Sequence, residues 1–122
     1  MGTNWTVTYF TETNGSDPVA DFLKTLRRGA GPKAVARLER QTDLLADLGF
    51  SAPEDIVRKV RGDLWELRVT FRKNPYRVLF YNPRGHELVL LHALHKKEQA
   101  ISEGDILKAN RRMADDRKRR NR

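Results

Sequence analysis

Between residues 56 and 99, apolar and polar residues alternate along the sequence IVRKVRGDLWELRVTFRKNPYRVLFYNPRGHELVLLHALHKKEQ. A period of two predicts β-strands, and the turn residues inside the segment divide it into three or four of them. One face of these strands is apolar and can pack against a core, whereas the other presents arginine, lysine, glutamate and histidine. Residues 5–10 alternate in the same way and predict an earlier strand.

Helical periodicity replaces this alternation in three other stretches. Asp17 followed by Pro18 has the form of an N-cap and a first helical residue, and a second helix is predicted from Pro32 to a stop at Gly49. These two helices are expected to form an antiparallel hairpin over the sheet. Near the C-terminus, Ser102 has the form of the N-cap of a third helix.

The order β-α-α-β-β-β-(β)-α contains a run of consecutive strands, which predicts hairpins and a mainly antiparallel sheet. The expected fold class is therefore α+β, with an N-terminal helical hairpin and a C-terminal helix. At 122 residues, the chain has the length of one domain. We assign residues 1–116 to that domain and residues 117–122 to a frayed basic tail.

Charge narrows the range of partners. The chain has 24 lysine and arginine residues against 16 aspartate and glutamate residues, a net charge of +8. A small domain this basic attracts phosphate polymers, although an acidic protein partner could also neutralise its charge. The absence of cysteine excludes disulfides and thiolate chemistry. No long apolar run or signal peptide is present, so we expect a cytoplasmic protein without a membrane partner.

The hairpin around residues 72–75 places two arginines on the polar face. If these four residues form its loop, Phe71 pairs with Tyr76, and Arg68 and Arg77 become diagonal neighbours, roughly 7–8 Å apart at the backbone. Two guanidinium groups at this spacing can bind one phosphate. The alternative is a surface salt bridge with Glu66, which lies on the same face and could act either as a general base or as a residue that orients an arginine.

Further candidates follow the last strand. His95 lies where the strand leaves the sheet, a suitable place for an acid or a base, whereas His92 lies in an apolar strand and is expected to be a hydrogen-bonded core residue. Lys97 could stabilise a scissile phosphate or protonate a leaving oxygen. The residues expected to contact RNA are Lys59, Arg61, Arg72, Lys73 and Lys96. No metal-ligand spacing or phosphate-cradling glycine loop is present, so we expect no cofactor.

Three motifs together resemble the RelE/HigB toxin superfamily, and within it the phage-derived, HigB-like branch. They are KVRGDLWELR at residues 59–68, YRVLFY at residues 76–81 and LLHALHKK at residues 90–97. The resemblance implies a compact RelE-like domain and a toxin of a type II toxin–antitoxin pair, a class in which most members cut mRNA in the ribosomal A site without a metal. It also implies a cognate antitoxin as partner, which we expect to be of the helix-turn-helix type.

Residue by residue, the resemblance assigns the basic positions of the family to Arg68, Arg77 and Lys97, and a position held by an acid or a base to Glu66. The family often has a tyrosine or histidine near its C-terminal end, but none follows Lys97 here. His95 and Lys97 therefore become the candidates for proton transfer. The expected reaction is attack of the RNA 2′-hydroxyl on the adjacent phosphate. The alternatives are a noncatalytic ParE-type toxin that poisons DNA gyrase and a basic nucleic-acid-binding regulatory subunit.

Overall fold

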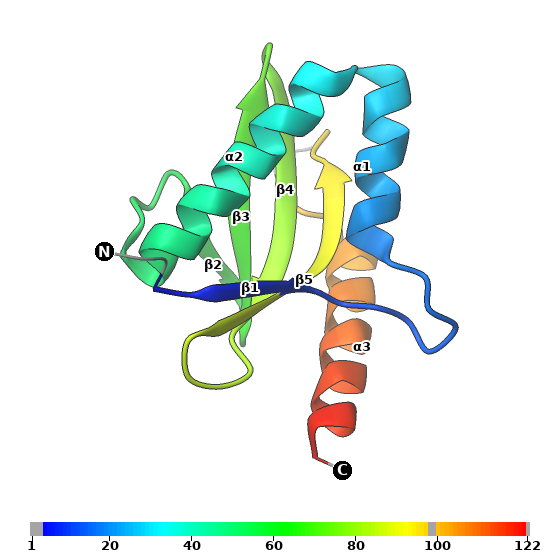
Figure 1. Cartoon of the computed structure of the whole chain (residues 1–122), viewed down its shortest axis with the longest axis vertical. Helices are drawn as coiled ribbons and strands as arrows, with labels where there is room; N and C mark the ends of the chain where they lie inside the picture. Colours follow the sequence, from blue (N-terminus) through cyan, green and yellow to red (C-terminus); the bar gives the residue numbers. More distant parts are fainter. Residues whose placement is uncertain (1–3, 98–99, 122) are drawn as a thin grey trace.

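A five-stranded sheet with the strand order β1-β5-β4-β3-β2 forms the centre of the computed structural model, which describes residues 4–97 and 100–121 (Figure 1). The strands are β1 (Thr6–Tyr9), β2 (Val57–Arg61), β3 (Leu64–Phe71), β4 (Asn74–Tyr81) and β5 (Glu87–His95). The helices are α1 (Pro18–Gly29), α2 (Pro32–Leu48) and α3 (Glu103–Arg120), with a short 3₁₀ helix η1 (Gly49–Ser51). Strands β2 to β5 pair antiparallel and β1 pairs parallel to β5, so the predicted α+β class is confirmed.

The helical hairpin of α1 and α2 lies across one face of the sheet (Figure 1). The Asp17 carboxylate accepts a hydrogen bond of 3.0 Å from the Ala20 amide, as expected of an N-cap. At the other end of the hairpin, α2 ends before Gly49, which has a φ of 54°. The Trp5 indole lies so close to Gly49 that an added Cβ would be 2.1 Å from its Nε1 atom. Only glycine fits both the backbone conformation and this contact.

Helix α3 covers part of the other face. Ser102 caps it by accepting a 3.1 Å hydrogen bond from the Asp105 amide, as predicted. The frayed tail expected after residue 116 is wrong for residues 117–121, because the helix continues to Arg120; Arg122 lies outside the described residues. Arg117 pairs with Asp63 at 2.6 Å and Arg120 with Glu87 at 3.0 Å. These carboxylates are distant in the sequence, so the charge pattern of the tail alone could not indicate them.

Two apolar clusters pack against the two faces of the sheet. The cluster under α1 and α2 includes Leu38 and Leu45 from α2, and Leu67, Val78 and Leu90 from the strands. The cluster under α3 includes Leu64, Leu79, Tyr81, Val89 and Leu91 from the strands, with Ile106, Ala109 and Met113 from the helix. The sheet is therefore buried on both faces over most of its area, and its polar side chains gather where α3 does not cover it.

The turn between β3 and β4 has two residues, not the four expected. Arg72 and Lys73 occupy it with φ angles of 49° and 69°, as in the mirror-image turns that suit hairpins, and Phe71 pairs with Asn74. The predicted register is therefore wrong by two residues. A shift of two leaves every side chain on its expected face, but it places Arg68 and Arg77 directly opposite each other instead of diagonally.

A bulge interrupts the pairing of β4 with β5. Phe80 pairs with Leu90 and Leu79 pairs with His92, so Leu91 is an extra residue without a partner in β4. Downstream of the bulge, each residue faces the side opposite to the one that regular alternation predicts.

Among the described residues, no helix has both the length and the apolar composition needed to span a membrane.

Candidate active site

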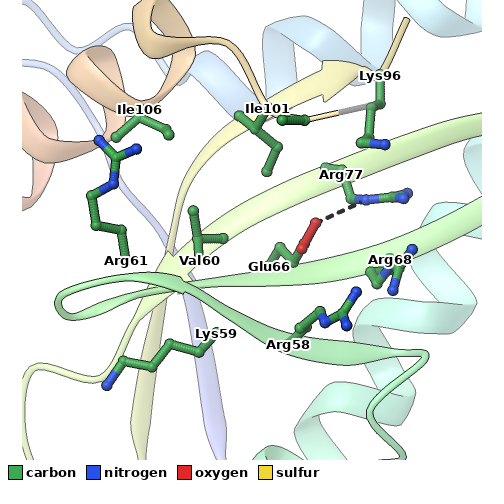
Figure 2. Close-up of a pocket in the computed structure, with 11 residues that line it drawn as sticks. Arg58, Lys59, Val60, Arg61, Glu66, Arg68, Arg77, Lys96, Ile101 and Ile106 are labelled. Carbon is green, nitrogen blue, oxygen red and sulfur yellow. Dashed lines mark ion pairs between the residues drawn. The ribbon is translucent and has the colours of Figure 1, made fainter. Parts of the chain in front are cut away.

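A groove with a volume of about 310 Å³ lies on the α3 side of the sheet, between β2, β3 and β4 and the beginning of α3 (Figure 2). Most of its polar lining is cationic. The basic residues are Arg58, Lys59, Arg61, Arg68, Arg77 and Lys96, the acidic residue is Glu66, and the apolar residues are Val60, Ala100, Ile101 and Ile106. Such a lining suits an anion with several oxygen atoms, and a phosphate group in particular.

Arg68 and Arg77 form the centre of this groove. Directly opposite residues of antiparallel strands have backbones about 4.5–5.5 Å apart, closer than the diagonal arrangement predicted from the sequence. Both side chains lie on the α3 side, and Arg68 is half-buried whereas Arg77 is buried. The sequence-based expectation that these two arginines converge on one face is therefore met, with a shorter separation.

Glu66 holds Arg77 in place. The Oε1 atom of Glu66 lies 2.8 Å from Nε of Arg77, and the two side chains are only 11% and 6% exposed. Their alignment does not meet hydrogen-bond geometry, so these two buried atoms interact as an ion pair. Arg77 also donates a 2.9 Å hydrogen bond from Nη1 to the Tyr76 carbonyl. The Arg77 guanidinium is thus fixed from two directions.

Burial lowers the pKa of the Arg77 guanidinium from its ordinary value. The attraction of Glu66 opposes this effect, and the repulsion of Arg68 adds to it. Arginine remains protonated under ordinary conditions because its ordinary pKa lies far above neutral pH. The two arginines therefore repel each other at the floor of the groove, and an anion bound between them would relieve that repulsion.

The bulge at Leu91 decides which residues after β5 reach the groove. Lys96 is half-buried and extends toward Arg77 (Figure 2). Lys97 is exposed and, with His95, lines a neighbouring pocket beside Asp105, which shares Lys96 and Ala100 with the groove. His95 stacks on Tyr76, with ring centroids 4.9 Å apart, on the side of the sheet that α1 covers. The structure thus brings Lys96 to the groove and leaves the predicted catalytic residues His95 and Lys97 outside it; Glu98 and Gln99 lie outside the described residues.

The other predicted RNA contacts surround the groove or lie apart from it. The Lys59 ammonium lies 5.6 Å from the Trp65 ring, and its side chain extends away from the other groove residues (Figure 2). Arg61 donates two hydrogen bonds of 3.0 and 2.9 Å to Glu103, which neutralises its charge. Arg72 and Lys73 are exposed at the distant β3–β4 turn.

The match to a known protein family covers the segment that contains the groove. The model of the phage-derived Gp49-like proteins (DUF891) matches residues 22–114, which is well over half of the chain. The chain belongs to the Gp49-like family. This family is of the RelE toxin type, so the coarser part of the resemblance is confirmed, and the HigB-like branch stays a prediction. Comparison with curated proteins gave no match.

One groove residue of this Gp49-like chain, Arg58, was not identified from the sequence. It lies opposite Glu66 in the pairing of β2 with β3, and its side chain extends toward Arg68 (Figure 2). Arg58 is exposed and lies 3.7 Å from the carboxylate of Glu54, a loose contact at the rim. The sequence did contain a signal, because alternation from the buried Val57 places Arg58 on the α3 side of β2.

The predicted core role of His92 is confirmed by its contacts. Its Nε2 atom lies 2.6 Å from the Asp105 carboxylate, and Arg112 approaches Nδ1 at 2.9 Å. Because arginine can only donate, Nδ1 must accept and Nε2 must carry the hydrogen that is donated to Asp105. Burial lowers the pKa of His92, and Arg112 and Lys108 lower it further, against the effect of Asp105. His92 therefore joins β5 to α3 as a neutral ring.

Metal-binding side chains do not cluster in the part of the chain that the structure describes. Among residues 4–97 and 100–121, no three histidine, aspartate or glutamate side chains lie together as a potential metal site. The groove itself offers guanidinium and ammonium groups, which bind anions and do not coordinate cations.

Proposed function

We propose that this Gp49-like chain is the toxin of a type II toxin–antitoxin pair and that it cuts mRNA in the ribosomal A site. The main support is the arrangement of Arg68 and Arg77, which face each other across β3 and β4 at the floor of the groove. Arg58 and Lys96 add positive charge at its two sides (Figure 2). Four cationic groups around one recess suit the phosphate backbone of RNA.

In the proposed reaction, the 2′-oxygen of RNA attacks the adjacent phosphorus and the bond from phosphorus to the 5′-oxygen breaks. The products end in a 2′,3′-cyclic phosphate and a 5′-hydroxyl. Negative charge grows on the phosphate oxygens during attack, and the preorganised guanidinium groups of Arg68 and Arg77 would stabilise it more than they stabilise the ground state. Because these groups supply the positive charge, the proposed mechanism requires no metal.

Two protons move in this reaction. The 2′-hydroxyl proton is assigned to the carboxylate oxygen of Glu66 that does not contact Arg77, so Glu66 would combine the two roles considered from the sequence. The 5′-oxygen receives a proton from the Lys96 ammonium, which takes the role that the sequence suggested for Lys97. His95 has no part in this proposal, because its ring stacks on Tyr76 and does not line the groove.

The proposed partners are mRNA on the ribosome and a cognate antitoxin, which we expect to be a helix-turn-helix protein. The basic groove supports the first partner, and membership of a RelE-type family supports the second. The localisation that follows from this proposal is the cytoplasm.

The proposal is tested by inducing the chain in growing cells and mapping the 5′ ends of cellular mRNA. We expect cuts in phase with codons, 5′-hydroxyl ends, and loss of both cuts and growth arrest in Arg68→Ala. Arg68 is the suitable target because its half-buried side chain can be removed without leaving a buried charge. The matched control is Arg28→Ala, an exposed arginine of α1, which should cut like the wild type.

Two results would contradict the nuclease. Growth arrest with DNA damage and intact mRNA would support a gyrase poison instead. Cutting by Arg68→Ala at the wild-type rate would mean that the groove takes no part in the mechanism. A phosphate contact of this kind typically contributes at least tenfold to the rate, which is about 1.4 kcal/mol.

A further inference from the structure

A second cleft lies on the opposite face of the sheet, between β1 and α2. Its volume is about 560 Å³, within the range of small-ligand sites. Trp5, Val7 and Tyr9 line it from the strand side, and Glu39 and Asp43 line it from the helix. Its chemistry is thus the reverse of the first groove, because it is aromatic and acidic in a chain whose net charge is +8.

The acidic wall of this cleft has no internal counterion. Glu39 and Asp43 are four residues apart on α2, so they lie one above the other on its surface. Both are exposed, and within the described residues neither forms an ion pair, although many other carboxylates do. Two like charges at this spacing destabilise a helix by a few tenths of a kcal/mol. A bound cation would reverse that cost.

The aromatic wall is rigid. The Trp5 indole stacks on His86 with ring centroids 4.5 Å apart, meets Phe50 edge-on at 5.3 Å, and lies against Gly49. Tyr9, on the same face of the strand beyond Val7, is half-buried. Burial raises the pKa of Tyr9, and the negative charges of Glu39, Asp17 and Asp43 raise it further. Aromatic faces and carboxylates both attract guanidinium and ammonium groups, so the two walls favour the same ligand.

We propose that this cleft binds basic side chains of another protein, presented by an extended segment with the pattern Arg-X-Arg. The carboxylates of Glu39 and Asp43 are one helical turn apart, about 6 Å along the helix axis. Alternate side chains of an extended segment are about 6.6–6.8 Å apart and project to the same side. One arginine can therefore pair with each carboxylate while its guanidinium lies near an aromatic ring. This inference does not depend on the nuclease, because the groove lies on the other face.

The probe for this site is the peptide acetyl-Ala-Arg-Ala-Arg-Ala-amide, titrated into the ¹⁵N-labelled full chain. The matched neutral probe replaces both arginines by citrulline, which keeps the shape and removes the charge. We expect saturable amide shifts confined to β1 and the middle of α2 with the arginine peptide, and none with the citrulline peptide. Binding should weaken as salt is added, because the contacts are exposed ion pairs.

The double variant Glu39→Gln/Asp43→Asn should raise the dissociation constant about tenfold, as expected for two exposed ion pairs lost together. Both side chains are exposed, so these isosteric changes leave the fold intact, which the amide spectrum verifies. Asp21→Asn/Asp55→Asn removes the same charge from exposed positions outside the cleft and should bind like the wild type. Equal binding of the citrulline peptide, equal effects of both double variants, or shifts spread over the whole surface would each overturn the proposal.

Discussion

Breaking the Glu66–Arg77 pair on one side should destabilise the protein strongly. The perturbation is Arg77→Met, which keeps an unbranched apolar side chain and leaves the Glu66 carboxylate without its partner at 11% exposure. At the observed separation of 2.8 Å, Coulomb's law with an effective dielectric constant of about 20 gives an attraction of about 6 kcal/mol. Desolvation of both groups offsets part of it, and removing one partner of a buried pair typically costs about 3–5 kcal/mol. The whole free energy of unfolding of a small domain is about 5–15 kcal/mol, so this loss would be a large part of it.

Replacing both partners should restore most of this loss. In Glu66→Leu/Arg77→Met no buried charge remains, and apolar replacement of a buried pair is often neutral or stabilising. The assay is urea unfolding followed by tryptophan fluorescence and circular dichroism, with equal m-values as the test of two-state behaviour. The control is Arg58→Met, which removes an exposed arginine 3.7 Å from the exposed Glu54 and should cost less than about 1 kcal/mol.

The reasoning would be refuted by either of two results. A loss below about 1 kcal/mol in Arg77→Met would mean that Glu66 is not held in a buried environment. A double variant that loses the sum of the two single losses would mean that the two residues do not interact.

Two further predictions concern the packing around the sheet. The pKa of His92 is lowered in the folded state, so the unfolded chain takes up a proton first as the pH falls below the ordinary value of 6.5. The free energy of unfolding should therefore decline from pH 7 toward pH 5, by at most about 1.4 kcal/mol per pH unit. Urea unfolding of His92→Asn should show a smaller decline in that window, and an unchanged one would contradict the assignment. Gly49→Ala should lower the free energy of unfolding by about 2 kcal/mol or more in thermal unfolding, because an added Cβ would collide with Trp5 and the backbone has a positive φ. Gly29→Ala has open space around the new Cβ and should not lower it.

Local signals in the sequence were sufficient for the starts of the helices and for the division of the sheet into two faces. Asp17 and Ser102 are N-caps in the structure because capping depends on residues only three positions away. The placement of Arg68 and Arg77 on one face also followed from alternation alone, since the buried Val69 and Val78 require it.

Features that depend on contacts between distant segments could not be predicted from the sequence in the same way. Asn74 and Pro75 have the composition of a turn, yet they belong to β4, because Arg72 and Lys73 adopt positive φ angles that few non-glycine residues take. The bulge at Leu91 has no mark in the sequence. Regular alternation without it would turn residues 95 and 97 toward the α3 side of the sheet, whereas the bulge turns Lys96 to that side.

The same bulge makes the groove depend on a residue that does not touch it. Arg112 of α3 donates from Nη1 to the Leu91 carbonyl at 3.0 Å and to the His92 ring at 2.9 Å, and so holds the extra residue at this point of the strand. If the strand continued in the regular register of Phe80 with Leu90, His95 would lie opposite Pro75 and would replace Lys96 at the groove. The groove would then have an imidazole ring in place of an ammonium group. Arg112 therefore helps to set the charge of the groove although it does not line it.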